Sequence, residues 1–513
     1  MTTFRRMLCA VLLCASPAFA QDVSLTSRDG AIEIEGTLLS YDGEFYRVDT
    51  IYGPLTLDGE GVTCAGPGCP DLDAFIAEAT FSGTRFIGDV LLPALIQSFA
   101  TQNQFSVTRE VQDDAHSTFI LSDAERVRAR FALRSSSTAE GYADLIADAA
   151  DIAMVLREPN HDELGLAAST SPSPLARNKR ARVLALDGLI AMTAPDQPVK
   201  SLTLEELSKV FQGEIRSWSD LGGVETEIVA LAPPENTGIH EALLSRIITP
   251  FGRGSLQAEQ SFPDPDDLAD AVARDASSIG LGTLSTVGNA VPMRLKGACG
   301  FEQEASVTSL RTEDYPLTLP LMLYTPPRRL PLILREFLAF TRSPAADLVI
   351  RRTGYVDQAI TESAFGELGD RLAHAIANVS AEAPLVELQR LVETLRNRTR
   401  LSTTFRFESG VRLDVQSSEN IARLAQALET GRFDGRSLVF VGFSDGQGPS
   451  GPNKELALRR AALVLDQVRE AAGIANFDQI EVAADAFGEV LPMACDDIAW
   501  GRSLNRRVEV WIE

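Results

Sequence analysis

The stretch that most constrains the fold of this chain runs from Ser437 to Ile512, close to its C-terminal end. It opens with an apolar segment, SLVFVGF, and a Gly-rich turn that carries Asp445 follows directly. A long amphipathic helix comes next, with Arg460 in its first turns, and the last residues alternate between apolar and polar side chains. A buried strand, a turn, a helix and a closing strand in this order predict an α+β domain.

The residues before this stretch complete the domain with a further strand and helix, so that residues 401–513 are predicted to fold as β, helix, β, helix, β. The segments GFSDGQG, NKELALRRA, AFGEVLP and GRSLNRRVEVWI together resemble the OmpA-like peptidoglycan-binding domain. The resemblance covers essentially all of residues 402–513. It implies that this domain anchors the chain non-covalently to peptidoglycan.

Two charged side chains of this domain suit a peptidoglycan stem peptide, whose diamino acid carries both an ammonium and a carboxylate group. A host site needs a carboxylate for the first group and a guanidinium for the second. By the resemblance, Asp445 accepts from the ammonium, Arg460 clamps the carboxylate, and Asn453 and Arg507 are secondary candidates. Taken alone, each residue has a plainer interpretation, because Asp445 suits an Asx turn and Arg460 suits a solvated helix face.

Residues 1–20 have the form of a secretory signal peptide. Arg5 and Arg6 precede an apolar run, and the small residues that follow predict cleavage after Ala20. The cysteines of this segment lie in no lipobox, and no later segment approaches the roughly 18 apolar residues of a membrane span. We therefore expect a periplasmic protein, without a membrane span, that is associated with the cell wall or outer membrane.

The charge of the chain excludes several classes of partner. Removal of residues 1–20 takes away two Arg and no acids, which moves the formal net charge from −24 to −26. Such a chain repels nucleic acid and anionic lipid at long range, so neither is expected as a partner. The four His are scattered without a paired Ser, Cys or metal-ligand spacing. The sequence therefore indicates no enzyme, no metal site and no cofactor.

Four cysteines remain after the signal peptide, and an oxidising compartment favours disulfides. Cys64 and Cys69 enclose a tight turn and are candidates for a bridge that closes a small loop. Cys299 and Cys495 either stay free or pair with each other.

At 513 residues the chain has room for three or four domains. Residues 21–70 alternate in the manner of strands around turns, which predicts a small β module. Residues 71–360 alternate between helices and short buried strands, the pattern of an α/β unit, and their number favours two lobes. Expected elements are helices at 88–100, 138–150, 204–211 and 238–248 and strands at 152–155 and 182–192. Residues 361–400 are interpreted as a short helical linker or docking helix.

Three loops of the α/β unit precede helices and carry hydroxyl or amide side chains, among them Ser82, Thr138 and Asn236. Free N–H groups at a helix start, with hydroxyls beside them, form an anion site. The same residues are also ordinary helix caps, which is the plainer interpretation of any one loop. Three such loops, together with Arg85 and Arg157, favour an anion site.

The segments FSGTRFIGDVLLPALIQSFA, SSSTAEGYADLIADAADIAMVLREP, LALDGLIAMTAP, LTLEELSKVFQGEIRSWSDLGG, TEDYPLTLPLMLY and FLAFTRSPAADLVIRRTGYV together resemble the PstS-like family. These are periplasmic phosphate-binding proteins of ABC transporters with the type II binding-protein fold. The resemblance implies an anion held between two lobes by loop hydroxyls and backbone N–H groups. The matching positions are Ser82, Thr84, Arg85 and Phe86 in the first loop, Ser136, Ser137 and Thr138 in the second, and Asn236 and Thr237 in the third.

The third loop, APPENTG, departs from the family because the usual Arg and Ser are missing and Glu235 adds a negative charge. Arg157 stands near the place where some members carry an Asp that accepts the phosphate proton. A guanidinium there supplies the lost positive charge through a bidentate contact. We therefore expect an oxyanion as the ligand, with phosphate as the favourite.

These inferences combine into a two-lobed type II periplasmic binding protein that follows a small β module and precedes an OmpA-like domain. Its expected function is binding of phosphate or a related oxyanion at the cell wall, in phosphate uptake or sensing. An ABC transporter permease is a further expected partner. The alternative is a structural protein of the cell envelope whose lobes mediate protein interaction without ligand transport.

Overall fold

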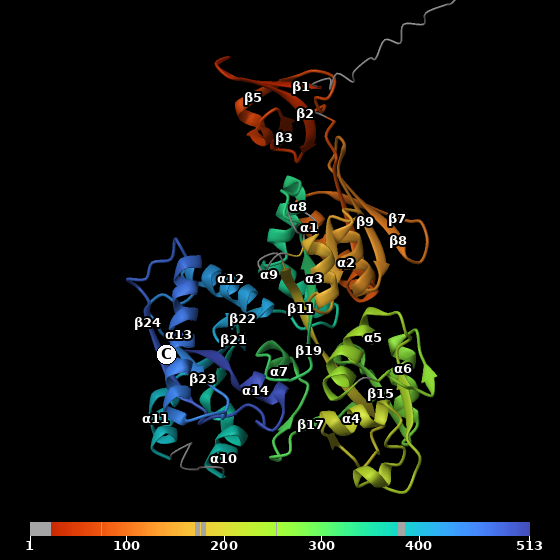
Figure 1. The fold of residues 1–513 in the computed structure, drawn as a ribbon, viewed down its shortest axis with the longest axis vertical. Coiled ribbons are helices and arrows are strands. Elements are labelled where there is room, and N and C mark those ends of the chain that lie inside the picture. Colours follow the sequence, from red (N-terminus) through yellow and green to blue (C-terminus); the bar gives the residue numbers. More distant parts are fainter. Residues whose placement is uncertain (1–21, 73, 170–174, 176–180, 253, 378–384) are drawn as a thin grey trace, which may run out of the picture. The chain divides into compact units, whose positions relative to one another are not determined.

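The computed structural model describes residues 22–72, 74–169, 175, 181–252, 254–377 and 385–513, so the predicted signal peptide lies outside the described residues. The chain forms two compact units (Figure 1). Arg329–Arg335 belong to the first unit together with the N-terminal residues up to Ala77, and Glu78–Arg328 and Glu336–Glu513 form the second. None of the helices in the described ranges combines the length and the apolar character that a bilayer crossing requires.

An antiparallel five-stranded sheet forms the first unit, in the order β4 (Gly53–Asp58), β3 (Phe45–Thr50), β2 (Glu33–Tyr41), β1 (Val23–Ser27) and β5 (Val62–Ala65). Side chains alternate along a strand, so one face collects the buried core of Val23, Leu25, Tyr46 and Val48. The turn between β2 and β3 contains Gly43, whose φ of 96° suits glycine. Cys64 on β5 forms a disulfide with Cys69.

One long sheet runs through both lobes of the second unit. In the first lobe the strand order is β7 (Ser106–Val111), β8 (His116–Ser122), β9 (Val127–Ser136), β6 (Ala77–Thr84), β10 (Ile152–Val155), β19 (Thr318–Tyr324) and β11 (Ala181–Thr193). The second lobe continues with β15 (Ser278–Thr283), β13 (Val229–Ala232) and β14 (Gln260–Ser261), and β16 (Val291–Pro292) also pairs with β11. The first part of β11 pairs with β19 and the last part with β15, so this strand connects the lobes.

Helices complete each lobe (Figure 1). Those of the first lobe are α1 (Leu92–Gln102), α2 (Thr138–Ile146), α3 (His161–Ala168), α8 (Leu332–Phe340) and α9 (Pro344–Arg352). Those of the second lobe are α4 (Leu204–Phe211), α5 (Gly238–Leu243), α6 (Pro265–Arg274) and α7 (Val307–Arg311). The strands β12 (Ser201–Leu202), β17 (Arg294–Lys296) and β18 (Glu302–Gln303) form a separate small sheet. Phe337 of α8 packs against the rings of Phe81, Phe99 and Phe131, which places an aromatic core in the first lobe.

The terminal domain is a sheet in the order β20 (Glu362–Ala364), β21 (Thr399–Ser409), β25 (Arg507–Ile512), β23 (Ser437–Phe443) and β24 (Glu481–Gly488), with β22 (Arg412–Leu413) paired to β21. Its helices are α10 (Gly369–Ala377), α11 (Leu385–Leu395), α12 (Val415–Glu429), α13 (Ser450–Ala471) and α14 (Ala499–Asn505). The continuous apolar run of β23 is buried on both faces. Leu438 and Phe440 pack with α12 and α13 residues, whereas Val439 and Val441 pack with α10 and α11 residues.

The segment interpreted as a linker or docking helix belongs to this architecture. β20 pairs with β21, and buried apolar residues of α10 and α11, among them Ala375, Leu391 and Leu395, share a core with Trp511 of β25. These helices cover the second face of the sheet, because a strand that is apolar on both sides needs a layer on each side. Residues 362–377 and 385–400 therefore dock on the sheet and do not act as a free linker.

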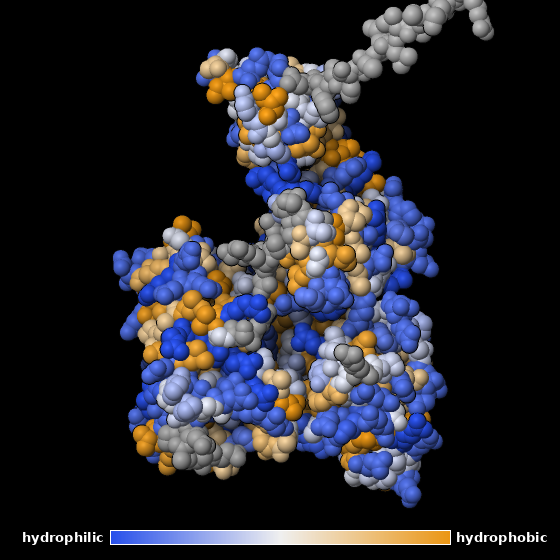
Figure 2. Space-filling model, viewed as in Figure 1, coloured by the Kyte–Doolittle hydropathy of each residue, from blue (hydrophilic) through white to orange (hydrophobic). Residues whose placement is uncertain are grey.

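The visible surface is largely hydrophilic. On the face shown in Figure 2, hydrophilic residues predominate and apolar residues are scattered among them. The formal net charge of the whole chain is −24. A surface of this kind favours solvation of the charged side chains.

Two neighbouring acidic residues, the buried Glu313 and the partly buried Asp314, lie just before β19, where the chain passes the terminal domain. Asp314 forms ion pairs with Arg400 at 2.5 Å and Arg406 at 3.2 Å. Glu313 accepts a hydrogen bond from Asn420 Nδ2 at 3.2 Å, and its φ of 57° is unusual for a residue other than glycine. Burial raises the pKa of Glu313 to about 8. Burial opposes the charge of Asp314 as well, but the arginines outweigh it and lower that pKa.

Glu313 makes the stability of the fold dependent on pH. Its folded pKa of about 8 exceeds the ordinary value of 4.5, so the folded chain holds a proton that the unfolded chain has released between these values. Stability therefore falls as pH rises from about 5 to about 8. We expect the free energy of unfolding of Glu313→Gln to fall by about 1–3 kcal/mol less than that of the wild type over this pH range.

Urea unfolding of the mature chain at the two ends of this range measures the effect. Glu304→Gln, at an exposed glutamate of the same lobe, is the matched control and should keep the wild-type decline. An unchanged decline in Glu313→Gln would show that the proton is held elsewhere.

Candidate functional site

The first predicted loop ends β6 in the interior of the first lobe. Ser82 Oγ donates a hydrogen bond to Asp144 Oδ2 at 2.6 Å, and Ser82 and Thr84 are each 1% exposed. Gly83 between them has a φ of 138°, and a Cβ there would lie 2.0 Å from the carbonyl oxygen of Met154 on β10. Only glycine fits this approach, so the sequence Ser-Gly-Thr brings two hydroxyls to the end of the strand.

The second loop leads from β9 into α2. Ser137 caps the helix by accepting from the backbone N–H of Glu140 at 3.2 Å, and Ser136 Oγ approaches the carbonyl oxygen of Gly83 at 3.5 Å. Thr138 is fully buried, and its Oγ1 accepts from the backbone N–H of Leu156 at 3.2 Å. Two of these hydroxyls therefore have the capping and supporting roles that any helix start favours.

The third loop belongs to the second lobe and meets the other two. Asn236 has a φ of 66°, and Thr237 caps α5 by accepting from the backbone N–H of His240 at 3.3 Å. A Cβ on Gly238 would lie 2.6 Å from Thr84 Oγ1 and 3.4 Å from the Oγ1 of Thr138. The start of α5 thus lies against the hydroxyls of the first lobe, and the cleft between the lobes is closed at this point. Glu235 is exposed.

Both predicted cations are engaged by carboxylates of the chain. Arg85, which is half exposed, pairs with Asp89 at 3.1 Å. Arg157 donates two hydrogen bonds of 2.8 Å to Glu163 and lies 3.9 Å from Glu241. Burial opposes the charge of Arg157, but the two glutamates outweigh it and raise its pKa. Arg157 therefore balances Glu163 and Glu241 in this structure.

Two further residues near the first loop, Asp187 and Tyr355, were not predicted from the sequence. Asp187 lies fully buried on β11, where its carboxylate accepts from Ser285 Oγ at 2.5 Å and from the Ser285 backbone N–H at 3.1 Å. Burial raises the pKa of Asp187 to about 6. Tyr355 donates its hydroxyl to the carbonyl oxygen of Phe86 at 3.0 Å, and the two rings pack 5.5 Å apart. The one available signal is that Asp187 is the single charged residue in the apolar run VLALDGLIAM.

In the terminal domain, Asp445 and Arg460 lie close enough to interact electrostatically. Asp445 is on the loop after β23 and pairs with Arg506 at 2.8 Å. Arg460 is 2% exposed on α13, where its Nε donates to the carbonyl oxygen of Gly410 at 2.8 Å and its guanidinium lies 5.1 Å from the ring centre of Phe407. Burial lowers the pKa of Arg460 to about 10.

The two secondary candidates are both structural in this arrangement. Asn453 Nδ2 donates to the carbonyl oxygen of Asp445 at 3.3 Å and to Glu489 at 3.1 Å, which holds the loop on the helix. Arg507 is fully buried, and its Nε donates to Glu509 Oε1 at 2.7 Å. Arg507 is the first residue of β25 and points inward, whereas Arg506, which directly precedes the strand, reaches the loop. The basic residue beside Asp445 is therefore Arg506, and the prediction for Arg507 is corrected.

The described residues contain no group of three or more His, Cys, Asp or Glu side chains arranged to hold a metal ion. The sequence model of the family described as PBP superfamily domain matches residues 80–345, more than half of the chain. The chain belongs to the PBP superfamily. The predicted two-lobed periplasmic-binding-protein fold is thereby confirmed, and the superfamily is one of substrate-binding domains.

Individual relatives match only a short segment of the chain or match it at low sequence identity. The phosphate-binding protein PstS of Bacillus subtilis is 36% identical over 55 residues, which are 11% of this chain and 18% of that protein. The ABC-type phosphate transport receptor of Vibrio cholerae superposes with a TM-score of 0.43 at 19% identity, over 54% of this chain and 99% of that one. The periplasmic domain of Helicobacter pylori MotB superposes with a TM-score of 0.19 at 21% identity, over 23% of this chain and 74% of that one.

The contrast between the two neighbouring arginines yields a stability prediction. Arg507→Ala leaves the fully buried Glu509 without its closest partner, which costs about 3–5 kcal/mol. Arg506→Ala removes a partly exposed pair and should cost less than about 1 kcal/mol. Thermal unfolding of the two variants measures the difference, and equal melting temperatures would contradict the structural role of Arg507.

Proposed function

We propose that this chain binds an oxyanion, phosphate first, between its two lobes and is held at the cell wall through its terminal domain. The observation that carries the proposal is the convergence of the three predicted loops at Thr84, Thr138 and Gly238. Hydroxyl and backbone N–H donors from both lobes meet there in the interior of the protein. Such donors bind an anion without a cation, because each hydrogen bond to a charged group contributes about 1.5–3 kcal/mol.

The orientation of Ser82 favours phosphate over sulfate. Its hydroxyl donates to Asp144 at 2.6 Å, so the remaining lone pairs of Ser82 Oγ are acceptors. Monohydrogen phosphate has a P–OH proton to donate, whereas sulfate has none near neutral pH. An acceptor in the site therefore favours phosphate and costs affinity for sulfate.

The first test measures phosphate binding to the mature chain by isothermal titration calorimetry. We expect binding, a weaker response to sulfate, and a dissociation constant raised about tenfold or more by Thr84→Val, which removes one hydroxyl donor. Thr101→Val, at an exposed threonine of α1, is the matched control and should bind as the wild type does. Absence of heat with millimolar phosphate would contradict the oxyanion function.

The wall-binding part of the proposal assigns Asp445 to the ammonium and Arg460 to the carboxylate of the stem peptide. Support comes from their electrostatic proximity and from Arg506, which neutralises Asp445 in this structure. An incoming ammonium would replace Arg506 as the partner of Asp445. The guanidinium of Arg460 forms no ion pair with carboxylates of the described residues, so it can take the carboxylate.

Pelleting with purified sacculi tests this assignment. Asp445→Ala and Arg460→Ala should each lower the bound fraction strongly, because loss of one charge-assisted contact lowers affinity roughly tenfold or more. Asp466→Ala and Arg459→Ala, at exposed positions of the same helix, are the matched controls. Full pelleting of both test variants, with unchanged melting temperatures, would show that this pair does not bind the wall.

One observation favours the alternative of a structural envelope protein. Arg85 and Arg157, the two cations expected at the anion, already pair with Asp89 and Glu163. If the chain pellets with sacculi but gives no heat with phosphate, its closed lobes would serve to bind another protein. A chain that does both would fit uptake or sensing, with an ABC transporter permease as the docking partner.

A further inference from the structure

We propose that the terminal domain is a latch across the two lobes, and that the disulfide between Cys299 and Cys495 keeps the cleft closed. The domain has a separate attachment to each lobe. One attachment consists of buried ion pairs and the other is covalent. A hinge motion of the lobes therefore has to break one of them.

The attachment to the first lobe is made by α12. Glu419, which is nearly inaccessible, accepts two hydrogen bonds of 2.7 Å from Arg342, on the turn after α8. Arg423, one turn further along α12, pairs with Asp347 of α9 at 3.2 Å. Burial opposes ionisation of Glu419, but the arginines outweigh it and lower its pKa. Separation of such a pair leaves an unpaired charge in the interior, so this attachment is firm.

The attachment to the second lobe is made by the loop before α14. Cys299 lies in the turn between β17 and β18, and Cys495 lies 196 positions further along the chain. Further contacts accompany the disulfide, among them a ring contact of 5.1 Å between Phe301 and His374 of α10. Gln303 Nε2 donates to the carbonyl oxygen of Met493 at 2.8 Å, and the backbone N–H of Ala298 donates to Asp497 at 3.2 Å.

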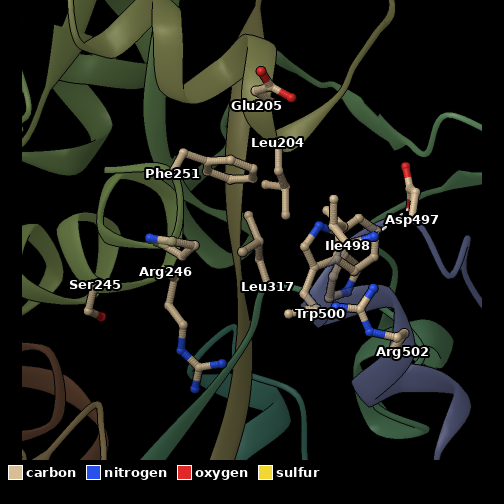
Figure 3. A pocket seen from close by; sticks show the side chains of 13 residues that line it. Leu204, Glu205, Ser245, Arg246, Phe251, Leu317, Asp497, Ile498, Trp500 and Arg502 are labelled. Atoms are coloured by element: carbon tan, nitrogen blue, oxygen red, sulfur yellow. Dashed lines mark hydrogen bonds between the residues drawn. The ribbon is translucent and has the colours of Figure 1, made fainter. Parts of the chain in front are cut away.

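A cleft interrupts the packing beside this second attachment. An open cleft of about 580 Å³ lies between α4, residues 245–251, which follow α5, and α14 (Figure 3). Leu204, Arg246 and Phe251 line it from the lobe, and Trp500 and Arg502 line it from the terminal domain. The cleft is open to solvent, so the surfaces that face each other across it are not buried against one another. The disulfide is therefore the covalent part of this attachment, and the ion pairs of Asp314 with Arg400 and Arg406 lie closer to the connecting strand β19.

The latched arrangement is the closed one. The start of α5 in the second lobe lies against Thr84 and Thr138 of the first lobe, as the position of Gly238 shows. Rotation about the connecting strands β11 and β19 would move the β17–β18 turn with the second lobe. Because α12 fixes the terminal domain to the first lobe, that movement pulls on Cys299 and Cys495. Without the disulfide, only non-covalent contacts such as the hydrogen bonds of Ala298 and Gln303 resist this movement of the second lobe.

A direct test needs no ligand. Azide-bearing amino acids at Val111 and Val224, which are 64% and 58% exposed on the two lobes, take a fluorophore pair without use of cysteine. We expect lower energy-transfer efficiency, and a broader distribution, in Cys299→Ser/Cys495→Ser than in the wild type. Cys64→Ser/Cys69→Ser removes the disulfide of the N-terminal module and is the matched control. Equal efficiency in all three proteins would overturn the latch.

A second route covers the case in which the double variant folds poorly. A phosphine reductant, which is oxidised while the disulfide takes up two electrons and two protons, is added to the labelled Cys64→Ser/Cys69→Ser protein. Efficiency should fall on reduction and return on reoxidation. No change, with both thiols shown to be free by mass spectrometry, would also overturn the proposal.

The consequence for ligand binding rests on the proposed oxyanion function. If only the closed form binds, removal of the latch lowers its population and raises the apparent dissociation constant for phosphate by the same factor, about three- to tenfold. Association should become faster, since opening no longer limits access. Absence of phosphate binding in every variant would contradict the proposed function alone, because the fluorescence measurement decides on the latch independently.

Discussion

The buried charge cluster around Glu509 is the interaction on which the rest of the second unit depends. Glu509 lies fully buried on β25 and accepts from Arg507 at 2.7 Å and from Arg371 of α10 at 3.1 Å. Arg400 of β21 lies 3.5 Å from it and also pairs with Asp314 at the lobe junction. Burial opposes the charge of Glu509, but these arginines outweigh it and hold its pKa far below the ordinary range.

This cluster explains why the terminal domain is docked. It joins the second helical layer, the sheet and the lobes through one carboxylate, and loss of a partner upsets the charge balance in the interior. The ion pairs of Glu419 and the disulfide of Cys495 extend the same contact to both lobes. Asp496, next to Cys495, accepts from the backbone N–H of Gly446 at 2.7 Å, so the loop of Asp445 is connected to the lobe attachment.

Local patterns predicted much of this fold. Expected strands and helices such as 152–155 and 204–211 match β10 and α4 residue for residue, and Leu385–Leu395 forms the helix that its leucine spacing indicates. The cleft was predictable to the level of its loops, because helix starts and hydroxyls are local signals. The roles of single side chains were less predictable. Arg507 was one position from the residue that reaches Asp445, and the boundary between α14 and β25, which falls between the two, decides which of them points inward.

By itself, the sequence determined the element types, the two-lobed α/β pattern and the adjacent cysteine pair, since these depend on periodicity or on residues a few positions apart. Only the tertiary structure decided the partners of Arg157, the use of both faces of β23 and the pairing of Cys299 with Cys495 across 196 positions. The physical reason is that charge neutralisation and disulfide formation depend on which elements pack together. That packing is set by the burial of all the apolar faces at once, and no single segment carries it.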